Sequence, residues 1–162
     1  MQAANNHLPR QAQHGVGLIE VLIAVLILSI GFLGIAALQA KALSTNNSAM
    51  SRSMAVVASY SILDAMRADR SNALNGSYNT SSPLKADACP TTTGTLAQTQ
   101  LNTWCNQLGQ NLGALASTTG NVNCSAAGDC TITVTFDESR MGTNSGGTDN
   151  TGLTTITTRA ML

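Results

Sequence analysis

The stretch HGVGLIEVLIAVLILSIGFLGIAALQAKAL, residues 14–43, decides how this chain of 162 residues is organised. From Val16 to Ala40 the only charged residue is Glu20, which lies near the beginning of the apolar run. An apolar run of about 18 residues or more, rising roughly 1.5 Å per residue as a helix, is long enough to cross a bilayer. The apolar region of a conventional secretory signal has only about 7–15 residues. We therefore predict a membrane-spanning helix here.

The helical pattern continues beyond this apolar stretch. No proline occurs between Pro9 and Pro83, so we predict one helix from about Leu18 to about Ser71 that ends before Asn75–Gly76. Its first half is apolar on all sides, and its second half is amphipathic. Bends are expected at Gly31 and Gly34, which either pack closely against a neighbouring helix or are merely tolerated, and at the polar run 44–48. The apolar face of the second half should cover a sheet, and it contains Met50, Met54, Val57, Leu63 and Met66.

The remainder of the chain reads as a small domain. Residues 76–96 contain Pro83, Pro90 and many turn residues and are expected to form a loop. Residues 95–115 have leucines and Trp104 at helical spacing, which predicts a short helix with the tryptophan in the core. Residues 131–136 alternate threonine with Ile132, Val134 and Phe136, which is typical of a strand with one buried face. A partner strand that begins with Val122 and Cys124 and a last strand at 153–162 complete a small antiparallel sheet, so the predicted fold class is α+β.

The composition excludes several kinds of function. The formal net charge is zero and no basic patch is present, so a nucleic-acid partner is not expected. Both histidines, His7 and His14, precede the apolar stretch, and a cut after Gly15 would leave a chain without histidine. Such a chain has no Ser-His or Cys-His pair and no histidine to bind a metal. We therefore expect no enzymatic activity, no metal and no cofactor.

The second half of the chain contains four cysteines and a group of acids. Four cysteines in a small exported domain indicate disulfides rather than free thiols, and without a C-x-x-C motif an all-cysteine zinc site is a weak alternative. Near the loop GGTDNTG, Asp137, Glu138 and Asp149 match no calcium-binding loop spacing, so we expect a solvated loop there. The cysteines are Cys89, Cys105, Cys124 and Cys130.

A cut after Gly15 would explain why a charged residue, Glu20, lies near the beginning of an apolar helix. The new amino terminus would be Val16, and Glu20 would lie in the first turn of the helix, where the helix dipole favours a carboxylate by roughly 0.3–1 kcal/mol. An unpaired charge at the bilayer centre would instead cost a few kcal/mol. An amine, either the chain's own or that of a neighbouring subunit, would offset this cost.

This stretch resembles the class III signal peptide of type IV pilins and pseudopilins. The resemblance lies in a short leader that carries Arg10 and no acid, the glycine at Gly15, a glutamate as fifth residue after the cut, and a long apolar helix. Two positions depart from the usual pattern, because Val16 replaces phenylalanine and Gly17 replaces threonine or serine. Within the family, the stretches LNTWCNQLGQNLGALASTTGNVNC and CTITVTFDE resemble PilV-type minor pilins, which carry a tryptophan-containing helix followed by a hairpin with a cysteine in each strand.

The resemblance implies a pilin fold and a specific processing route. Residues 1–15 would be a leader peptide, residues 16–40 the transmembrane and assembly half of the helix, and residues 41–162 a periplasmic globular domain. A prepilin peptidase would cut between Gly15 and Val16 and methylate the amine of Val16. Glu20 would then pair with the terminal amine of an adjacent subunit in the growing fibre.

The resemblance also implies a structural role. PilV-type minor pilins help to prime assembly of the type IV pilus and enter the fibre, in a tip complex with other minor pilins and an adhesin, next to the major pilin. The chain would lie in the inner membrane before assembly and in the surface fibre afterwards. One alternative is a minor pseudopilin of a type II secretion system. Another is a soluble periplasmic domain released by cleavage after Ala42, since Ala40–Ala42 has the A-x-A form of a conventional cleavage site.

Three disulfide pairings are possible for four cysteines. The favoured pairing joins Cys124 to Cys130 across the hairpin and Cys89 to Cys105 around the short helix. A disulfide that closes a loop of about 15 residues would contribute on the order of 3 kcal/mol, which is large for a small domain.

Overall fold

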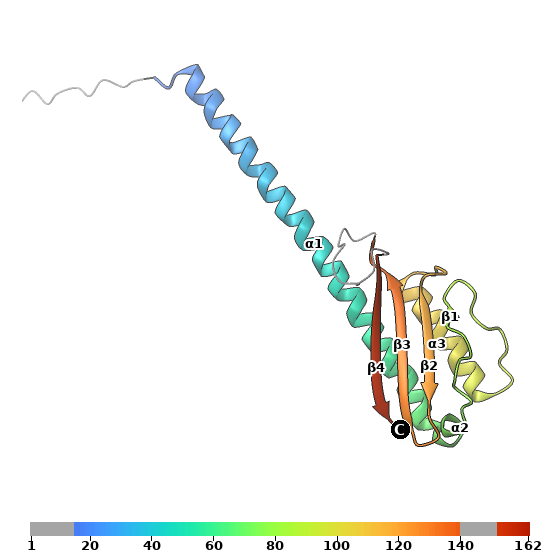
Figure 1. The fold of residues 1–162 in the computed structure, drawn as a ribbon. Coiled ribbons are helices and arrows are strands. Elements are labelled where there is room, and N and C mark those ends of the chain that lie inside the picture. Colours follow the sequence, from blue (N-terminus) through green and yellow to red (C-terminus); the bar gives the residue numbers. More distant parts are fainter. Residues whose placement is uncertain (1–14, 140–151) are drawn as a thin grey trace, which may run out of the picture. The chain divides into compact units, whose positions relative to one another are not determined.

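The structure is a computed structural model that describes residues 15–139 and 152–162 (Figure 1). Its helices are α1 (Leu18–Ala68), α2 (Arg70–Leu74) and α3 (Leu96–Leu112). Its strands are β1 (Leu84–Lys85), β2 (Thr119–Cys124), β3 (Asp129–Asp137) and β4 (Leu153–Met161). The chain divides into two compact units, Met1–Ala40 and Lys41–Leu162, and α1 contributes to both. The predicted α+β fold, a long N-terminal helix with a small antiparallel sheet, is confirmed.

The long helix was predicted almost to its observed ends. The helix α1 has 51 residues and continues through Gly31, Gly34 and the polar run 44–48. It ends at Ala68, and after Asp69 the short α2 continues as far as Leu74. Gly76 then adopts a φ of 79°, a left-handed conformation that glycine tolerates best, so the predicted stop at Asn75–Gly76 coincides with the end of α2.

The sheet is antiparallel throughout, with the order β1-β2-β3-β4. A tight turn that contains Gly128 joins β2 to β3 and places Cys124 directly opposite Cys130. The strand β1 lies in a segment that we expected to be a loop. It has only two residues, both paired with β2, and two residues are too few to produce an alternating pattern that sequence reasoning could detect.

The core of the second unit lies between one face of the sheet and the helices. From the sheet it receives Val122, Ile132, Val134 and Phe136, all at most 1% exposed. Trp104 on α3 is 2% exposed, as predicted for a core residue, and its Nε1 donates a hydrogen bond of 2.9 Å to the carbonyl oxygen of Ala58 on α1. This bond satisfies the one polar atom of the indole and fixes α3 against α1.

The predicted apolar stripe of α1 was wrong in part. Leu63 and Met66 are fully buried, but Met50 and Val57 are each 59% exposed. The indole of Trp104 reaches the backbone of α1 at Ala58, so small side chains at that level leave room for it. The buried face of α1 therefore consists of small and medium-sized residues, namely Ser48, Ala55, Ala58, Ser59, Ile62, Leu63 and Met66.

The second half of α1 runs alongside β3 in the opposite direction. Near one end of this contact Arg52 of α1 meets Glu138, which directly follows β3. Near the other end Met66 Sδ lies 3.6 Å from Sγ of Cys124, the residue paired with Cys130 at the beginning of β3. The helix thus contacts the residue that follows β3 at one end and, at the other end, the β2 residue that pairs with the beginning of β3.

Candidate processing and assembly site

The predicted cleavage site lies immediately before α1. Residues 15–17 are not helical, and the carbonyl oxygen of Gly17 accepts the first helical hydrogen bonds, from the backbone N–H groups of Glu20 (2.9 Å) and Val21 (3.3 Å). The peptide bond between Gly15 and Val16 is therefore outside the helix, in a non-helical segment of the kind a peptidase can bind. Val16 is 71% exposed.

Nothing within the described chain requires a glycine at position 15. A Cβ atom added to Gly15 would meet no other atom within 4 Å. This contrasts with Gly120 on β2, where a Cβ atom would lie 2.5 Å from the Cη2 atom of Trp104. Packing within the described residues therefore gives no reason for a glycine at position 15.

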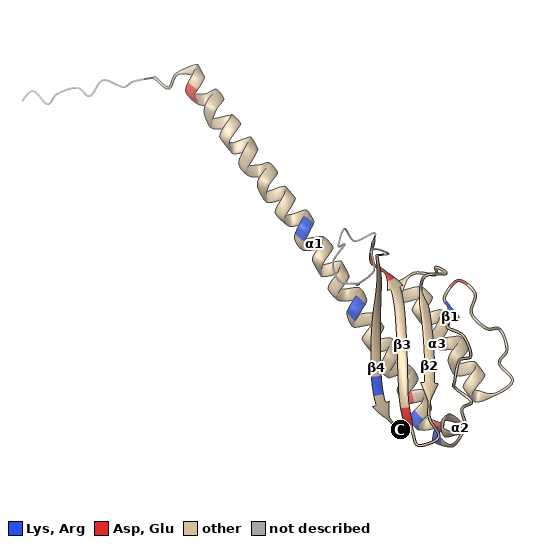
Figure 2. Ribbon diagram, viewed as in Figure 1, with Lys and Arg blue, Asp and Glu red and all other residues tan. Residues whose placement is uncertain are grey.

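Glu20 occupies the first turn of α1, where the free N–H groups of the helix favour a negative charge. Its side chain is exposed, and among residues 15–139 and 152–162 it has no hydrogen-bond or ion-pair partner. The next charged residue along α1 is Lys41 (Figure 2). Within the described residues, the side chain of Glu20 therefore has no compensating positive charge.

The helix around Glu20 is apolar and exposed on every side within the chain. Leu18, Phe32 and Leu38 are 79%, 62% and 72% exposed. In the described part of the chain α1 is the one helix long and apolar enough to cross a membrane. The polar hydroxyl of Ser29 is compatible with an apolar environment, because it donates a hydrogen bond of 2.7 Å to the carbonyl oxygen of Val25. This surface is suited to lipid or to the helices of other subunits.

Gly31 and Gly34 lie within the same surface. A Cβ atom at either position would meet nothing within 4 Å in the chain, so internal packing does not explain these glycines. Two interpretations therefore stay predictions: a neighbouring helix packs closely against these glycines, or a membrane helix merely tolerates them.

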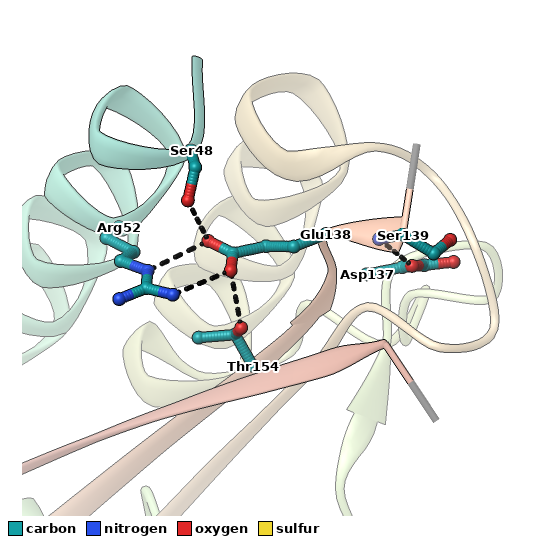
Figure 3. A network of polar contacts seen from close by, with 6 residues as sticks. All are labelled: Ser48, Arg52, Asp137, Glu138, Ser139 and Thr154. Atoms are coloured by element: carbon teal, nitrogen blue, oxygen red, sulfur yellow. Dashed lines mark hydrogen bonds and ion pairs between the residues drawn. The ribbon is translucent and has the colours of Figure 1, made fainter. Parts of the chain in front are cut away.

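A second polar site, in the globular unit, was missed by sequence reasoning (Figure 3). Glu138, 2% exposed, accepts hydrogen bonds from Arg52 Nε (3.0 Å) and Ser48 Oγ (3.1 Å) at Oε1. At Oε2 it accepts hydrogen bonds from Arg52 Nη2 (2.9 Å) and Thr154 Oγ1 (2.7 Å). The hydrogen bonds from the Arg52 guanidinium lower the pKa of the Glu138 carboxyl in spite of its burial, and those from Thr154 and Ser48 lower it further. The carboxylate therefore ties the end of β3 and the beginning of β4 to α1.

The expectation of a solvated acidic loop was therefore wrong for Glu138. Its neighbour Asp137 accepts a hydrogen bond of 2.8 Å from the backbone N–H of Ser139, and Asp149 lies outside the described residues. The alternation of β3 contained a signal for this burial, because residues 130, 132, 134 and 136 point inward and position 138 continues that series. Among the residues that the structure describes, no group of three histidine, cysteine, aspartate or glutamate side chains is arranged to hold a metal.

Two disulfides stabilise the globular unit. One joins Cys89 in the loop after β1 to Cys105 on α3, and the other joins Cys124 to Cys130 across the hairpin. This is the pairing that the sequence analysis favoured. The cysteines thus belong to the globular unit, residues Lys41–Leu162, while Gly15, Val16 and Glu20 lie around the beginning of α1 in the unit Met1–Ala40.

Comparison with known proteins gives one match. Residues 10–36, about a sixth of the chain, match the prokaryotic N-terminal methylation motif. No curated protein and no solved structure matches the chain. The matched segment contains the non-helical Gly15–Val16 bond, the first-turn Glu20 and most of the apolar part of α1. The motif is that of the class III signal peptide, which implies processing by a prepilin peptidase, and it indicates a precursor of the type IV pilin or pseudopilin kind.

Proposed function

We propose that the chain is a minor pilin of the PilV type. In this proposal residues 1–15 are a leader peptide, residues 16–40 form the membrane and assembly half of the helix, and residues 41–162 form a periplasmic domain. The prepilin peptidase cuts between Gly15 and Val16 and methylates the new amine of Val16. The non-helical conformation of residues 15–17 and the open space around Gly15 support this assignment.

In the proposed assembly step Glu20 pairs with the methylated amine of Val16 on an adjacent subunit. A carboxylate without a partner in the apolar core of a fibre would be costly, because burial of an isolated charge is strongly unfavourable. An amine of opposite charge at the correct depth removes most of this cost, so subunits with a free amine are favoured. Before cleavage the leader blocks the amine, and uncut chains should not assemble.

The globular unit supports the finer assignment to the PilV type. The helix α3 carries Trp104, and the hairpin β2–β3 carries one cysteine of a disulfide in each strand. Both features belong to the resemblance that suggests this group. The chain would then prime pilus assembly and enter the fibre near its tip, together with other minor pilins, the major pilin and an adhesin. Its exposed apolar helix would reside in the inner membrane before assembly.

A minor pseudopilin of a type II secretion system is the second candidate, because the same leader and helix serve both kinds of fibre. Release of a soluble domain by cleavage after Ala42 is disfavoured by the local structure. The helix α1 continues without a break through Ala40–Ala42, so this bond is not in an extended segment.

The single observation that carries the proposal is the placement of Gly15 and Glu20 around the beginning of a continuous 51-residue helix. The test is analysis of the amino terminus of the protein in two fractions, sheared surface fibres and membranes. Methylated Val16 in both fractions is the expected result. Methylated Val16 in membranes alone would favour a pseudopilin or a scarce priming subunit, and a terminus at Leu43 or an intact Met1 would contradict the proposal.

A further inference from the structure

The connection between α2 and α3, which contains β1, forms most of a pocket on the globular unit (Figure 1). The pocket has a volume of about 400 Å³, which is enough for a small molecule. One wall consists of residues 77–82, before β1, and the other contains Pro90 and Thr92, after β1. The first turns of α3 complete it with Gln98 and Leu101. None of these residues belongs to the processing site or to the Glu138 site.

The wall before β1 is fixed to the edge of β2. The side-chain NH2 group of Asn79 donates a hydrogen bond of 2.9 Å to the carbonyl oxygen of Cys124, and its Oδ1 accepts one of 2.7 Å from the backbone N–H of Cys124. The backbone N–H of Thr80 donates to the carbonyl oxygen of Val122 (2.9 Å), and the Thr80 hydroxyl accepts from the N–H of Val122 (3.1 Å). This wall is therefore held in place before any ligand arrives, which lowers the cost of binding.

The wall after β1 is fixed to α3. The disulfide between Cys89 and Cys105 joins this segment covalently to the helix. One turn before Cys105, the side-chain amide of Asn102 donates a hydrogen bond to the carbonyl oxygen of Pro90. Both walls of the pocket thus have fixed positions on the core of the globular unit.

Most of the side chains that line the pocket can form hydrogen bonds. Seven of the ten lining residues carry a hydroxyl or an amide. The Oε1 atom of Gln98 accepts a hydrogen bond of 3.2 Å from the backbone N–H of Thr95 in the capping box of α3. The NH2 group of Gln98 has no partner among the described residues. The same is true, within the described chain, of the hydroxyl groups of Ser77, Ser81, Ser82 and Thr92.

The apolar part of the pocket is small and aliphatic. It consists of Leu101, which is 9% exposed, Leu84, which packs against the core, and Pro90. In the described part of the chain, no residue that lines the pocket carries a charge, so nothing there would select a phosphate, a carboxylate or an amine. Free hydroxyl and amide groups around an aliphatic surface suit a sugar ring, which has hydroxyl groups at its edge and C–H groups on its faces.

We propose that this pocket binds a neutral saccharide. The C–H groups of one sugar ring contact the aliphatic surface, and the hydroxyl groups of the ring exchange hydrogen bonds with the free serine and threonine hydroxyls and with the NH2 group of Gln98. This binding activity goes beyond the function proposed above and does not rest on it, because every lining residue lies in the unit Lys41–Leu162.

Nuclear magnetic resonance titration of the isotope-labelled full chain tests this proposal. The chain is held in micelles of an alkylphosphocholine detergent, because a glycoside detergent would itself offer a sugar to the pocket. The probes are glucose, galactose, mannose and N-acetylglucosamine, each titrated to about 0.1 M, well above the millimolar range of weak binding. A blocked, uncharged tripeptide is titrated in parallel. The readouts are the backbone amides of residues 77–82 and Thr92 and the side-chain amide of Gln98.

A pair of matched double variants shows whether the pocket is responsible. Ser81→Ala with Thr92→Val removes one free hydroxyl from each wall and keeps the backbone bonds that hold the walls. The control combines Ser53→Ala with Thr103→Val, at two exposed positions outside the pocket. Unchanged fluorescence of Trp104 and unchanged resonances outside the pocket establish that both variants are folded.

The expected result is that at least one sugar shifts the pocket resonances in a saturable way. The dissociation constant should rise about tenfold in the pocket variant, since two ordinary hydrogen bonds are lost, and should stay unchanged in the control. Three results would overturn the proposal: no saturable shift with any of the four sugars, equal binding by the native chain and the pocket variant, or tighter binding of the tripeptide at the same resonances. An amino terminus other than Val16 would refute the proposed function and leave this result untouched.

Discussion

Glu138 and Arg52, which are 86 residues apart in the sequence, are joined by two hydrogen bonds of 3.0 and 2.9 Å. The carboxylate is buried, whereas the arginine side chain is 42% exposed. The pair therefore combines a desolvated acid with a base that still contacts water. Removal of the arginine would leave a buried charge with only two hydroxyl partners, Ser48 and Thr154.

The substitution Glu138→Gln should lower the free energy of unfolding by about 1–3 kcal/mol, because it removes charge-assisted hydrogen bonds from a buried position. The measurement is urea unfolding of the full chain in detergent, followed by the fluorescence of Trp104, the one tryptophan. The control is Asp64→Asn, which breaks the exposed Arg67–Asp64 pair and should change stability by less than about 0.5 kcal/mol. Equal effects of the two substitutions would contradict this interpretation of the Glu138 site.

The same carboxyl predicts a dependence of stability on acid pH. The pKa of Glu138 is lowered in the folded chain, principally by its hydrogen bonds from Arg52. The carboxylate of Glu138 therefore contributes fully to the free energy of unfolding above the ordinary glutamate pKa of about 4.3. This contribution is lost as the pH falls through the lowered pKa of the folded chain. The stability difference between the native chain and Glu138→Gln should shrink as unfolding is measured at increasingly acid pH. A constant difference would contradict the assignment.

The buried phenol of Tyr78 predicts that the stability of the fold depends on pH in the alkaline range. Its burial, together with the nearby Asp69 carboxylate that accepts its hydrogen bond, raises the pKa of the phenol to about 12. The unfolded chain releases this proton near pH 10, so the contribution of Tyr78 is complete below about pH 10 and is lost as the pH rises toward the folded pKa. The substitution Tyr78→Phe should reduce the decline of stability above about pH 10. Tyr60→Phe, at a position that is 52% exposed, is the matched control and should leave the decline unchanged.

Gly120 predicts a packing effect. A Cβ atom there would lie 2.5 Å from Cη2 of Trp104 and 2.6 Å from Cδ1 of Leu108, so Gly120→Ala must shift these buried side chains of α3. We expect a loss of about 1–3 kcal/mol, which is typical of overpacking. Gly31→Ala, in open space on α1, should not destabilise the isolated chain and should slightly favour the helix. Thermal unfolding of the two variants in detergent compares them directly.

The proposed pairing of Glu20 predicts that a substitution at this position impairs assembly into the fibre without preventing cleavage of the leader. The substitution Glu20→Gln keeps the size of the side chain and removes the charge that is proposed to pair with the amine of Val16. Cleavage after Gly15 should continue, while the amount of the protein in sheared fibres should fall by tenfold or more, since pairing of a desolvated charge is worth more than about 1.4 kcal/mol. Normal incorporation of the variant would contradict the proposed pairing.

The sequence predicted the elements with strong periodicity and missed contacts between distant segments. The helix α1, the short helix with Trp104 and the alternating strand around Ile132 all carry local patterns, and all are present in the structure. The buried face of α1 could not be read correctly, because its small residues are explained only by the arrival of Trp104 from α3. Met50 and Val57 fit the helical period equally well and are nevertheless exposed.

The candidate processing site could be proposed from the sequence because its residues are close neighbours along the chain. Gly15, Val16 and Glu20 lie within six consecutive positions, so their spacing alone expresses the motif. The Glu138 site depends on residues from α1, from β4 and from the position after β3 that the fold brings together, and only the inward alternation of β3 pointed to it. A buried acid can be suspected from such alternation, but its partner cannot be named before the register of helix and sheet is known.

The antiparallel course of α1 beside β3 has a mechanical consequence. The helix is joined to the sheet by Arg52 and Glu138 near one end and by Met66 and Cys124 near the other. Tension applied along the helix would therefore load the contacts between these two points in shear, all at once, instead of peeling them apart in sequence. Near Met66, the Cys124–Cys130 disulfide joins β2 to β3 covalently beside their turn. These two strands therefore cannot separate there under such a load.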